Sequence, residues 1–308
     1  MDSALKRDAI VPEVTLGTTP STPGFLNLRT INIDGDPERP NERSPERVYH
    51  GQATNMYQGL ARYPKTFNLP WARDAATDVL WGSLFNAAWA TNVLKNGQTP
   101  AGFTLEEKYE GGATDPYRRV TGMLVDSATV AFAMDGQPGR LSFVARGRAE
   151  TTATAAISGA TYADPTPGYD PVTAAEVAVG NLFSVTSPIL QSLNLQITNS
   201  LQERYGFSSP NPVRHGRGWF DVRGTAEFDL SAAADYSTFA TRQQGLAFDI
   251  TIGSVANYKD KLEVMKADVW NPNLRDPGVT GTHTVMLNFM ARYNAADSAA
   301  LKLTRLIA

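Results

Sequence analysis

The chain has 308 residues, with 28 Lys and Arg against 31 Asp and Glu, three His, no Cys and 42% hydrophobic residues. This length allows one large domain or two of about 150 residues, and the near-neutral charge, spread over both halves, argues against a protein that binds nucleic acid through a basic patch. The absence of Cys excludes disulfides, thiolate metal sites and cysteine nucleophiles.

The first residues, 1–8, lack the apolar stretch of a cleaved signal peptide. Elsewhere no run of the sequence approaches the ~18 apolar residues that a membrane-spanning helix requires. We therefore expect a soluble protein that carries no cleaved signal.

Alternation of apolar and polar residues is the main pattern along the chain. It predicts half-buried strands over residues 25–33, 141–146 and 248–254. The last alternating segment, residues 300–306, is expected to close a sheet. The pattern indicates a mainly β fold with a minor helical part.

Two segments have the period of a helix instead. Residues 74–88 follow a Pro-Trp pair, and Asp74 is placed to cap the predicted helix. One face of this helix collects its large apolar residues, which are Val79, Leu80, Leu84 and Phe85. A shorter helix is predicted over residues 231–242, with Ser231 as its cap.

The middle of the chain suggests a boundary between two domains. Residues 149–203 contain no Lys or Arg, and residues 151–172 are rich in Thr, Ala, Gly and Pro, which is typical of a linker. A hairpin is predicted next, over residues 176–185, with its turn at Gly180-Asn181. The expected division is an N-terminal arm over 1–24, a domain over 25–150, a linker over 151–172 and a domain over 173–308.

Internal similarity supports this division. Residues 102–105 are echoed by residues 247–250, and residues 141–146 by residues 287–292, at offsets of 145 and 146. The triplet Leu26-Asn27-Leu28 resembles Leu193-Asn194-Leu195. Together these echoes predict a duplicated domain.

Residues with catalytic or metal-binding chemistry are sparse. The three histidines, His50, His215 and His283, are far apart in sequence, and no hydrolase, phosphate-loop or dinucleotide motif is present. Asp34-Gly35-Asp36 lacks the further ligands of a calcium loop and favours a turn. Glu106-Glu107 could supply paired carboxylates, although acidic runs are usually solvated. We expect no enzyme activity and no cofactor.

Two loops, residues 37–48 and 204–217, are rich in arginine, and in the first loop glutamates interleave with the arginines. Such alternation suits a contact between copies of one protein, where Arg–carboxylate pairs fix the register; an ordinary solvated loop is the alternative. The predicted contact residues are Arg39, Glu42, Arg43, Glu46, Arg47, Arg204, Arg214 and Arg217.

The order of several motifs resembles the major tail tube proteins of tailed bacteriophages. Residues 16–23 are similar to the extended N-terminal segment of that family. Further similarity lies at residues 78–81, 92–97, 103–107 and 117–122, and at 141–143, 193–199 and 222–228. The similarity extends over nearly the whole chain.

This resemblance implies a structural virion protein whose copies form rings, and the rings stack into the hollow tail tube through which the genome leaves the capsid. It implies β-sandwich domains, each flanked by a helix, whose inner sheets join around the ring into one β-barrel. Two such domains per chain predict a trimeric ring with pseudo-sixfold symmetry rather than a hexamer. Tape measure, tail terminator and baseplate proteins are the implied partners, and DNA is expected to pass without specific binding. The implied location is the virion tail, after synthesis in the host cytoplasm.

Three other functions remain as alternatives. Another ring-forming tail component, such as a tail terminator, a baseplate ring or the inner tube of a contractile tail, would have a similar sequence. A β-sandwich hydrolase would need paired acids with perturbed pKa values in a cleft. An adhesive or carbohydrate-binding module would use exposed aromatic residues, for which Tyr57, Tyr63 and Trp71 are candidates.

Overall fold

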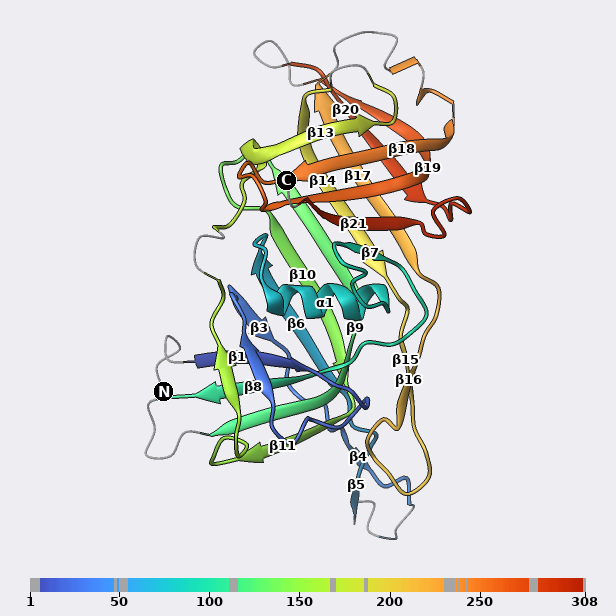
Figure 1. Cartoon of the computed structure of the whole chain (residues 1–308). Coiled ribbons are helices and arrows are strands. Elements are labelled where there is room, and N and C mark those ends of the chain that lie inside the picture. The colour runs from blue at the N-terminus through green and yellow to red at the C-terminus, as the bar shows by residue number, and fades with distance from the viewer. Residues whose placement is uncertain are drawn as a thin grey trace.

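Strands account for most of the fold in the computed structural model, which describes residues 6–46, 49, 55–110, 116–166, 170–185, 188–229, 236–237, 239–241, 243–276 and 282–306. This mainly β fold agrees with the sequence prediction (Figure 1). In chain order the elements are β1 (Lys6–Pro12), β2 (Gly24–Asn27), β3 (Asn32–Asp34), β4 (Asn41–Arg43), β5 (Met56–Gln58), β6 (Tyr63–Pro70), α1 (Ala75–Phe85), β7 (Val93–Lys95), β8 (Phe103–Tyr109), β9 (Tyr117–Ala133), β10 (Arg140–Gly147), β11 (Ala149–Ala153), β12 (Thr161–Ala163), a 3-10 turn (Ala174–Glu176), β13 (Val177–Leu182), β14 (Leu190–Thr198), β15 (Gln202–Arg204), β16 (Arg214–Gly216), β17 (Asp221–Asp229), β18 (Gln243–Ile252), β19 (Lys259–Arg275), β20 (Thr284–Ala291) and β21 (Leu301–Leu306).

A continuous antiparallel sheet forms the spine of the molecule. Its strand order is β3, β6, β10, β9, β14, β17, β20, β19. The strict alternation of β6 shows why one face is inward: Tyr63, Lys65, Phe67 and Leu69 are buried, and the intervening side chains are half-buried on the other face. We call this sheet the central sheet.

The middle of the central sheet joins residues that are far apart in sequence. Ser127 to Ala133 of β9 pair with Thr198 to Ser192 of β14. Val130 lies opposite Leu195, and both side chains are buried in the same core. This pairing makes one sheet from the two halves of the chain.

A second layer of strands covers the inward face of each half. In the first half β1 pairs with β8, β8 with the N-terminal half of β9, and that part of β9 with β11. In the second half β13 pairs with β18, β18 with the N-terminal half of β19, and that part of β19 with β21. The fold is therefore a β-sandwich in which one long strand of each half, β9 or β19, contributes to both layers.

Helix α1 closes the first half of the sandwich and lies in front of β6, β10 and β9 (Figure 1). Asp74 caps it as predicted, since its Oδ1 accepts the backbone N–H of Thr77 at 2.6 Å. The predicted helix over 74–88 ends earlier, at Asn86, whose φ of 50° is left-handed. Leu80, Leu84 and Phe85 are buried as expected, and Val79 is partly buried against the same core.

The two halves share their pairing pattern in detail. β9 and β19 each have 17 residues. Phe103 pairs with Met123 in the first half, and Phe248 pairs with Val264 in the second. Likewise Phe143 lies opposite Ala128, and Phe289 opposite Val269. All four phenylalanines are fully buried. The echoes of 102–105 in 247–250 and of 141–146 in 287–292 therefore occupy corresponding positions.

Three details of the sequence analysis were wrong. The strand predicted over 25–33 is divided into β2 and β3. Leu26-Asn27-Leu28 does not correspond to Leu193-Asn194-Leu195; Ile31-Asn32-Ile33 does, because Ile33 pairs with Phe67 of β6 as Leu195 pairs with Gly224 of β17. The Gly180-Asn181 pair does not form a turn.

Instead, β13 runs through Gly180-Asn181 as one strand with a bulge, and all of it pairs with β18. A Cβ at position 180 would collide with the carboxylate of Asp249 on β18, so glycine is needed here for a close approach at the bulge rather than for a turn.

The remaining predicted strands are confirmed: 141–146 lies in β10, 248–254 largely in β18, and 300–306 largely in β21. The helix predicted over 231–242 lies mostly outside the described residues, as does its cap Ser231; Tyr236, Ser237 and Phe239 are helical. The segment 151–172 contains the end of β11 and the whole of β12, which pairs with β2 in parallel.

Candidate assembly and channel surfaces

Two hairpin arms extend from the same end of the central sheet, at the bottom of Figure 1. The first arm (residues 35–62) connects β3 to β6 and contains β4 and β5. The second arm (residues 199–220) connects β14 to β17 and contains β15 and β16. These arms are the two arginine-rich loops of the sequence, and they leave equivalent strands in the two halves.

Within one chain the arms contact each other. The backbone N–H of Ala61 donates to the carbonyl of Pro210 at 2.8 Å, and the hydroxyl of Tyr63 donates to Oδ1 of Asn211 at 2.7 Å. Nε of Arg62 lies 3.4 Å from Oε2 of Glu203. The return strand of the first arm therefore packs on the second arm.

The predicted contact residues lie mainly on the surfaces of these arms. Arg39 sits over the ring of Tyr63 at 5.9 Å, and Glu42 accepts the hydroxyl proton of Tyr57 at 2.8 Å. Exposed positions are also held by Arg43, Glu46, Arg204 and Arg214. Arg47 lies outside the described residues. The structure thus gathers the predicted residues on two adjacent projections.

Arg217 differs from the other predicted contact residues. Its Nη1 donates to the carbonyl of Gly97, and burial lowers the pKa of its guanidinium. This side chain attaches the base of the second arm to the loop between β7 and β8.

Each end of the central sheet presents an edge without a strand partner among the described residues. At one end β3 pairs only with β6, and at the other the last residues of β19, from Trp270 to Arg275, pair only with β20. Both edges carry exposed apolar side chains: Ile31, next to β3, is 65% exposed and Leu274 of β19 is 45% exposed. Unpaired edges of this kind readily pair with another chain.

The outward face of the central sheet is uncovered and largely uncharged. One row across it runs from Asn32 through Asn68, Ser142, Thr129 and Gln196 to Arg223, Met290 and Asp268. Hydrogen bonds join the first three: Nδ2 of Asn68 donates to Oδ1 of Asn32, and Oγ of Ser142 donates to Oδ1 of Asn68, each at 2.9 Å.

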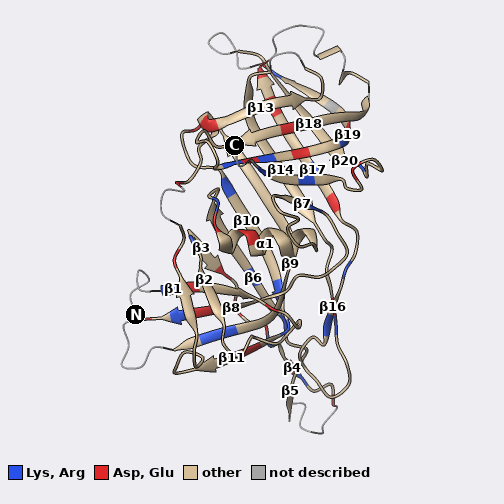
Figure 2. Cartoon of the chain, viewed as in Figure 1, with Lys and Arg blue, Asp and Glu red and all other residues tan. Residues whose placement is uncertain are grey.

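Charged groups on this face are few, and most of its carboxylates are paired with arginines. Asp221 pairs with Arg223, Glu227 with Arg275 and Asp268 with Arg292. Figure 2 shows the middle of the central sheet mostly tan, whereas blue and red gather on β1 and β8.

The Glu106-Glu107 pair is buried, with both side chains 1% exposed. Glu107 lies 2.7 Å from Lys65 and 2.8 Å from Lys6, and Glu106 lies 2.7 Å from Arg119. Burial alone would raise the pKa of Glu107, but the two lysines outweigh it and hold that pKa below its ordinary value. Because successive residues of a strand point to opposite faces, Glu107 lies between the two layers with Lys65, whereas Glu106 lies on the other face of β8 with Arg119 and Tyr162.

The histidines are not grouped. Burial, together with Arg148 and Arg146, lowers the pKa of His215 to about 4, so that its ring is neutral. His283 is exposed beside Asp276, and His50 lies outside the described residues. Within the described part of the chain, no group of three or more His, Asp or Glu is arranged to hold a metal ion.

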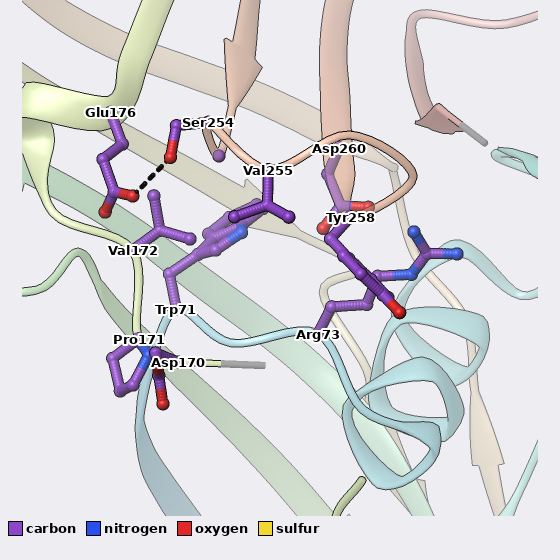
Figure 3. A pocket seen from close by; sticks show the side chains of 11 residues that line it. Trp71, Arg73, Asp170, Pro171, Val172, Glu176, Ser254, Val255, Tyr258 and Asp260 are labelled. Atoms are coloured by element: carbon purple, nitrogen blue, oxygen red, sulfur yellow. Dashed lines mark hydrogen bonds between the residues drawn. The ribbon is translucent and has the colours of Figure 1, made fainter. Parts of the chain in front are cut away.

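A small cavity of about 120 Å³ lies where the first half, the segment around Asp170 and the β18–β19 turn meet (Figure 3). Asp260 is 8% exposed there, and burial raises its pKa to about 6 against the attraction of Arg73 and a hydrogen bond from Trp71. On the opposite wall Oγ of Ser254 donates to Oε1 of Glu176 at 2.7 Å. Trp71 is 2% exposed and packs against Trp81 and Phe132, so it is not available as an adhesive platform.

The sequence analysis did not identify the sheet edges or Trp219, an 87% exposed residue at the base of the second arm. A tryptophan in a loop otherwise rich in polar residues was a visible signal. The edges had no such signal, because which strand ends a sheet depends on the pairing of the whole chain.

Among the described residues, no helix is both long and apolar enough to cross a lipid bilayer.

Comparison with known proteins agrees with the fold and the resemblance. None of the curated proteins matches the chain. A family model described as phage tail tube protein matches residues 6–296, which is nearly the whole chain. A β-sandwich whose central sheet, among the described residues, ends in unpaired edges suits a structural protein of this kind. The chain therefore belongs to the phage tail tube protein family and is a structural component of the virion tail.

Proposed function

We propose that copies of this chain close into rings, and that the rings stack into the tail tube through which the genome is ejected into the host. The central sheet carries this proposal: it contains four strands from each half, joined side by side, and it has an unpaired edge at each end. A sheet of this kind is completed when further copies extend it into a closed barrel, which removes the edges.

The shared pairing pattern of the two halves supports a duplicated tube domain. We retain the division into an N-terminal arm (1–24), domains over 25–150 and 173–308, and a linker over 151–172. Three chains then supply six domains, so we favour a trimeric ring with pseudo-sixfold symmetry over a hexamer.

The pairing of β9 with β14 inside the chain serves as a template for the contact between chains. β9 corresponds to β19, and β14 corresponds to β3, so that the free edge of β19 would pair with β3 of the next copy. Leu193 lies opposite Phe132 within the chain. The corresponding pair between chains is Ile31 opposite Leu274, and both of these apolar side chains are exposed in the single chain.

The dimensions of such a barrel suit duplex DNA. About 24 strands at ~4.8 Å spacing and ~40° tilt give a circumference of about 150 Å and a backbone diameter of about 48 Å. Side chains of roughly 5 Å on each wall leave about 38 Å, against roughly 20 Å for the duplex.

The outward face of the central sheet would line this channel. Its amide and hydroxyl side chains, and its arginines whose charges are balanced by adjacent carboxylates, offer phosphate little attraction. A basic lining would bind DNA by releasing counterions and would slow its passage. We infer that DNA slides through without specific binding.

Stacking of rings is assigned to the two arms, which extend beyond one end of the central sheet. Their exposed Arg and Glu side chains would pair with the adjacent ring. Tape measure, terminator and baseplate proteins would meet the same tube in the virion, after synthesis in the host cytoplasm.

Electron microscopy of the purified chain tests the proposal. The wild-type protein is expected to form rings or tubes with a central channel. Leu274→Glu places a charge between the proposed edges and should leave the chain monomeric, whereas Met290→Glu, a control on the open face at 37% exposure, should still assemble. A wild-type chain that stays monomeric at every concentration, or assembly by Leu274→Glu equal to wild type, would contradict it.

The alternative is another ring-forming tail component or the inner tube of a contractile tail. The same family match and the same edges are compatible with it. Single rings that never stack, under conditions of full assembly, would favour a terminator or baseplate ring over a tube.

A further inference from the structure

The two arms contact each other through different sides. The return strand of the first arm, at residues 61–63, touches the outgoing side and the tip of the second arm. The return strand of the first arm leads into β6, which is closer than β3 to the second half of the central sheet. If the halves repeat around a ring, the return strand of the second arm must face the outgoing side of the first arm of the next copy.

The strand registers identify the corresponding residues. Phe67 and Gly224 lie opposite Phe143 and Phe289, respectively, which fixes an offset of 157 residues between β6 and β17. The same offset relates Arg62 to Trp219. Trp219 thus holds in the second half the position that Arg62 holds in the first half, and Arg62 contacts the second arm from that position.

The other side of the contact follows in the same way. Ile33 and Leu195 correspond, with an offset of 162 residues between β3 and β14. This offset relates Asn41 of β4 to Glu203, the residue that Arg62 contacts at 3.4 Å. The expected counterpart of the Arg62–Glu203 contact is therefore Trp219 of one copy against the region of Asn41 in the next.

From this correspondence we propose that Trp219 anchors one chain to its neighbour in the same ring, by packing on the first arm of that neighbour around Pro40, Asn41, Glu42 and Leu60. This inference rests on the proposed ring. Trp219 is 87% exposed in the single chain, and buried tryptophans are among the residues that contribute most to binding between proteins.

The surface that would receive it has suitable chemistry. A hollow on the first arm is lined by Pro40, Glu42 and Leu60 together with neighbouring charged side chains. Leu60 is 50% exposed and supplies apolar area, and the exposed carboxylate of Glu42 can accept a hydrogen bond from the indole N–H. An apolar centre with a polar rim is the usual composition of a stable interface.

Cysteine cross-linking tests this contact directly, because the natural chain has no Cys. The double variant Asn41→Cys/Trp219→Cys is assembled as for the wild type and then treated with a short bifunctional maleimide, because a contact between the ends of long side chains leaves more room between the backbones than a disulfide spans. Covalent multiples of the 33.4 kDa chain are expected on a denaturing gel, ending at the number of chains in the ring.

Two controls accompany the double variant. Arg62→Cys/Glu203→Cys joins the arms inside one chain and should leave the mass at that of a single chain, with loss of free thiols. Tyr293→Cys/Trp219→Cys pairs the tryptophan position with another exposed site and should give no defined ladder. Assembled rings whose Asn41→Cys/Trp219→Cys chains stay single would overturn the inference, while the proposed ring would stand.

A truncation gives a second measurement that needs no cross-link. Trp219→Ala should raise the protein concentration needed for ring formation at least about tenfold. Phe207→Ala, which removes an equally exposed aromatic side chain from the tip of the second arm, should leave that concentration unchanged. Equal ring formation by Trp219→Ala and wild type would also overturn the inference, and failure of the wild type to form rings would instead reject the proposed function.

Discussion

The side chain of Asn199 joins three elements of the fold at the base of the second arm. It is fully buried, and its Nδ2 donates to the carbonyl of Leu84 in α1 at 2.6 Å and to the carbonyl of Val125 in β9 at 3.0 Å. Its Oδ1 accepts Nδ2 of Asn86 at 3.2 Å. One amide of the second half therefore satisfies three polar groups of the first half.

Replacing this amide should be costly. Asn199→Leu keeps the number and branching of heavy atoms but removes the side-chain donor to Val125, leaves Leu84 only the 3.3 Å bond from Asn86, and removes the acceptor of Asn86, so we expect the free energy of unfolding to fall by about 2–4 kcal/mol. Urea denaturation measures this. Asn194→Leu, on the exposed side of β14, is the matched control and should change stability by less than about 0.5 kcal/mol.

Asp260 gives the protein a predicted dependence on pH. Burial raises its pKa from 3.8 to about 6, so that ionisation is disfavoured in the folded chain. Its contribution to stability is therefore complete below pH ~4 and is lost as the pH rises through about 6, which amounts to about 3 kcal/mol.

Asp260→Asn removes this ionisation and keeps an acceptor for Trp71. The variant should be more stable than wild type at pH 7.5, by up to about 3 kcal/mol, and should show no such gain at pH 4. Thermal unfolding at the two pH values measures the difference. An equal effect of the substitution at both pH values would show that the carboxyl titrates normally.

The charged residues of the first arm lead to a prediction about the stacking of rings. Reversing the charges of Arg39, Arg43 and Arg47 to Glu should leave rings intact but prevent tubes, because pairs between rings would become repulsive. Negative-stain images of the purified variant give the answer. Tubes of normal length from this variant would contradict the assignment.

The sequence predicted elements wherever the pattern was local. Asp74 marked the start of α1, and alternation located β10, β18 and β21, because a capping residue or a period of two is visible within a few residues. The echo between Phe143 and Phe289 was equally accessible and identified corresponding strands.

The partner of each strand could not be predicted from such local patterns. Ile31-Asn32-Ile33 and Leu26-Asn27-Leu28 have the same alternation, and only the partner strand decides which of them corresponds to β14. The same reason explains why the free edges at Ile31 and Leu274 were missed. The charged arm residues were found because interleaved Arg and Glu are a property of sequence alone.

For the whole molecule, the duplicated arrangement predicts the mass of the ring. Three chains of 33.4 kDa give a ring of about 100 kDa, whereas a hexamer would have twice that mass. Native mass spectrometry of rings released from tubes distinguishes the two. Projection images down the ring axis should show three major repeats with six similar lobes.

The pairing of β9 with β14 also bears on how quickly a ring can form. This pairing joins two four-strand units on one polypeptide. In a ring of six such units, half of the pairings between units therefore exist before any two molecules meet. Completing a trimer then requires two bimolecular steps instead of five, and each step avoided spares the loss of translational and rotational freedom that association entails. A fused pair of units should therefore nucleate rings at lower protein concentrations than separate units with the same contacts.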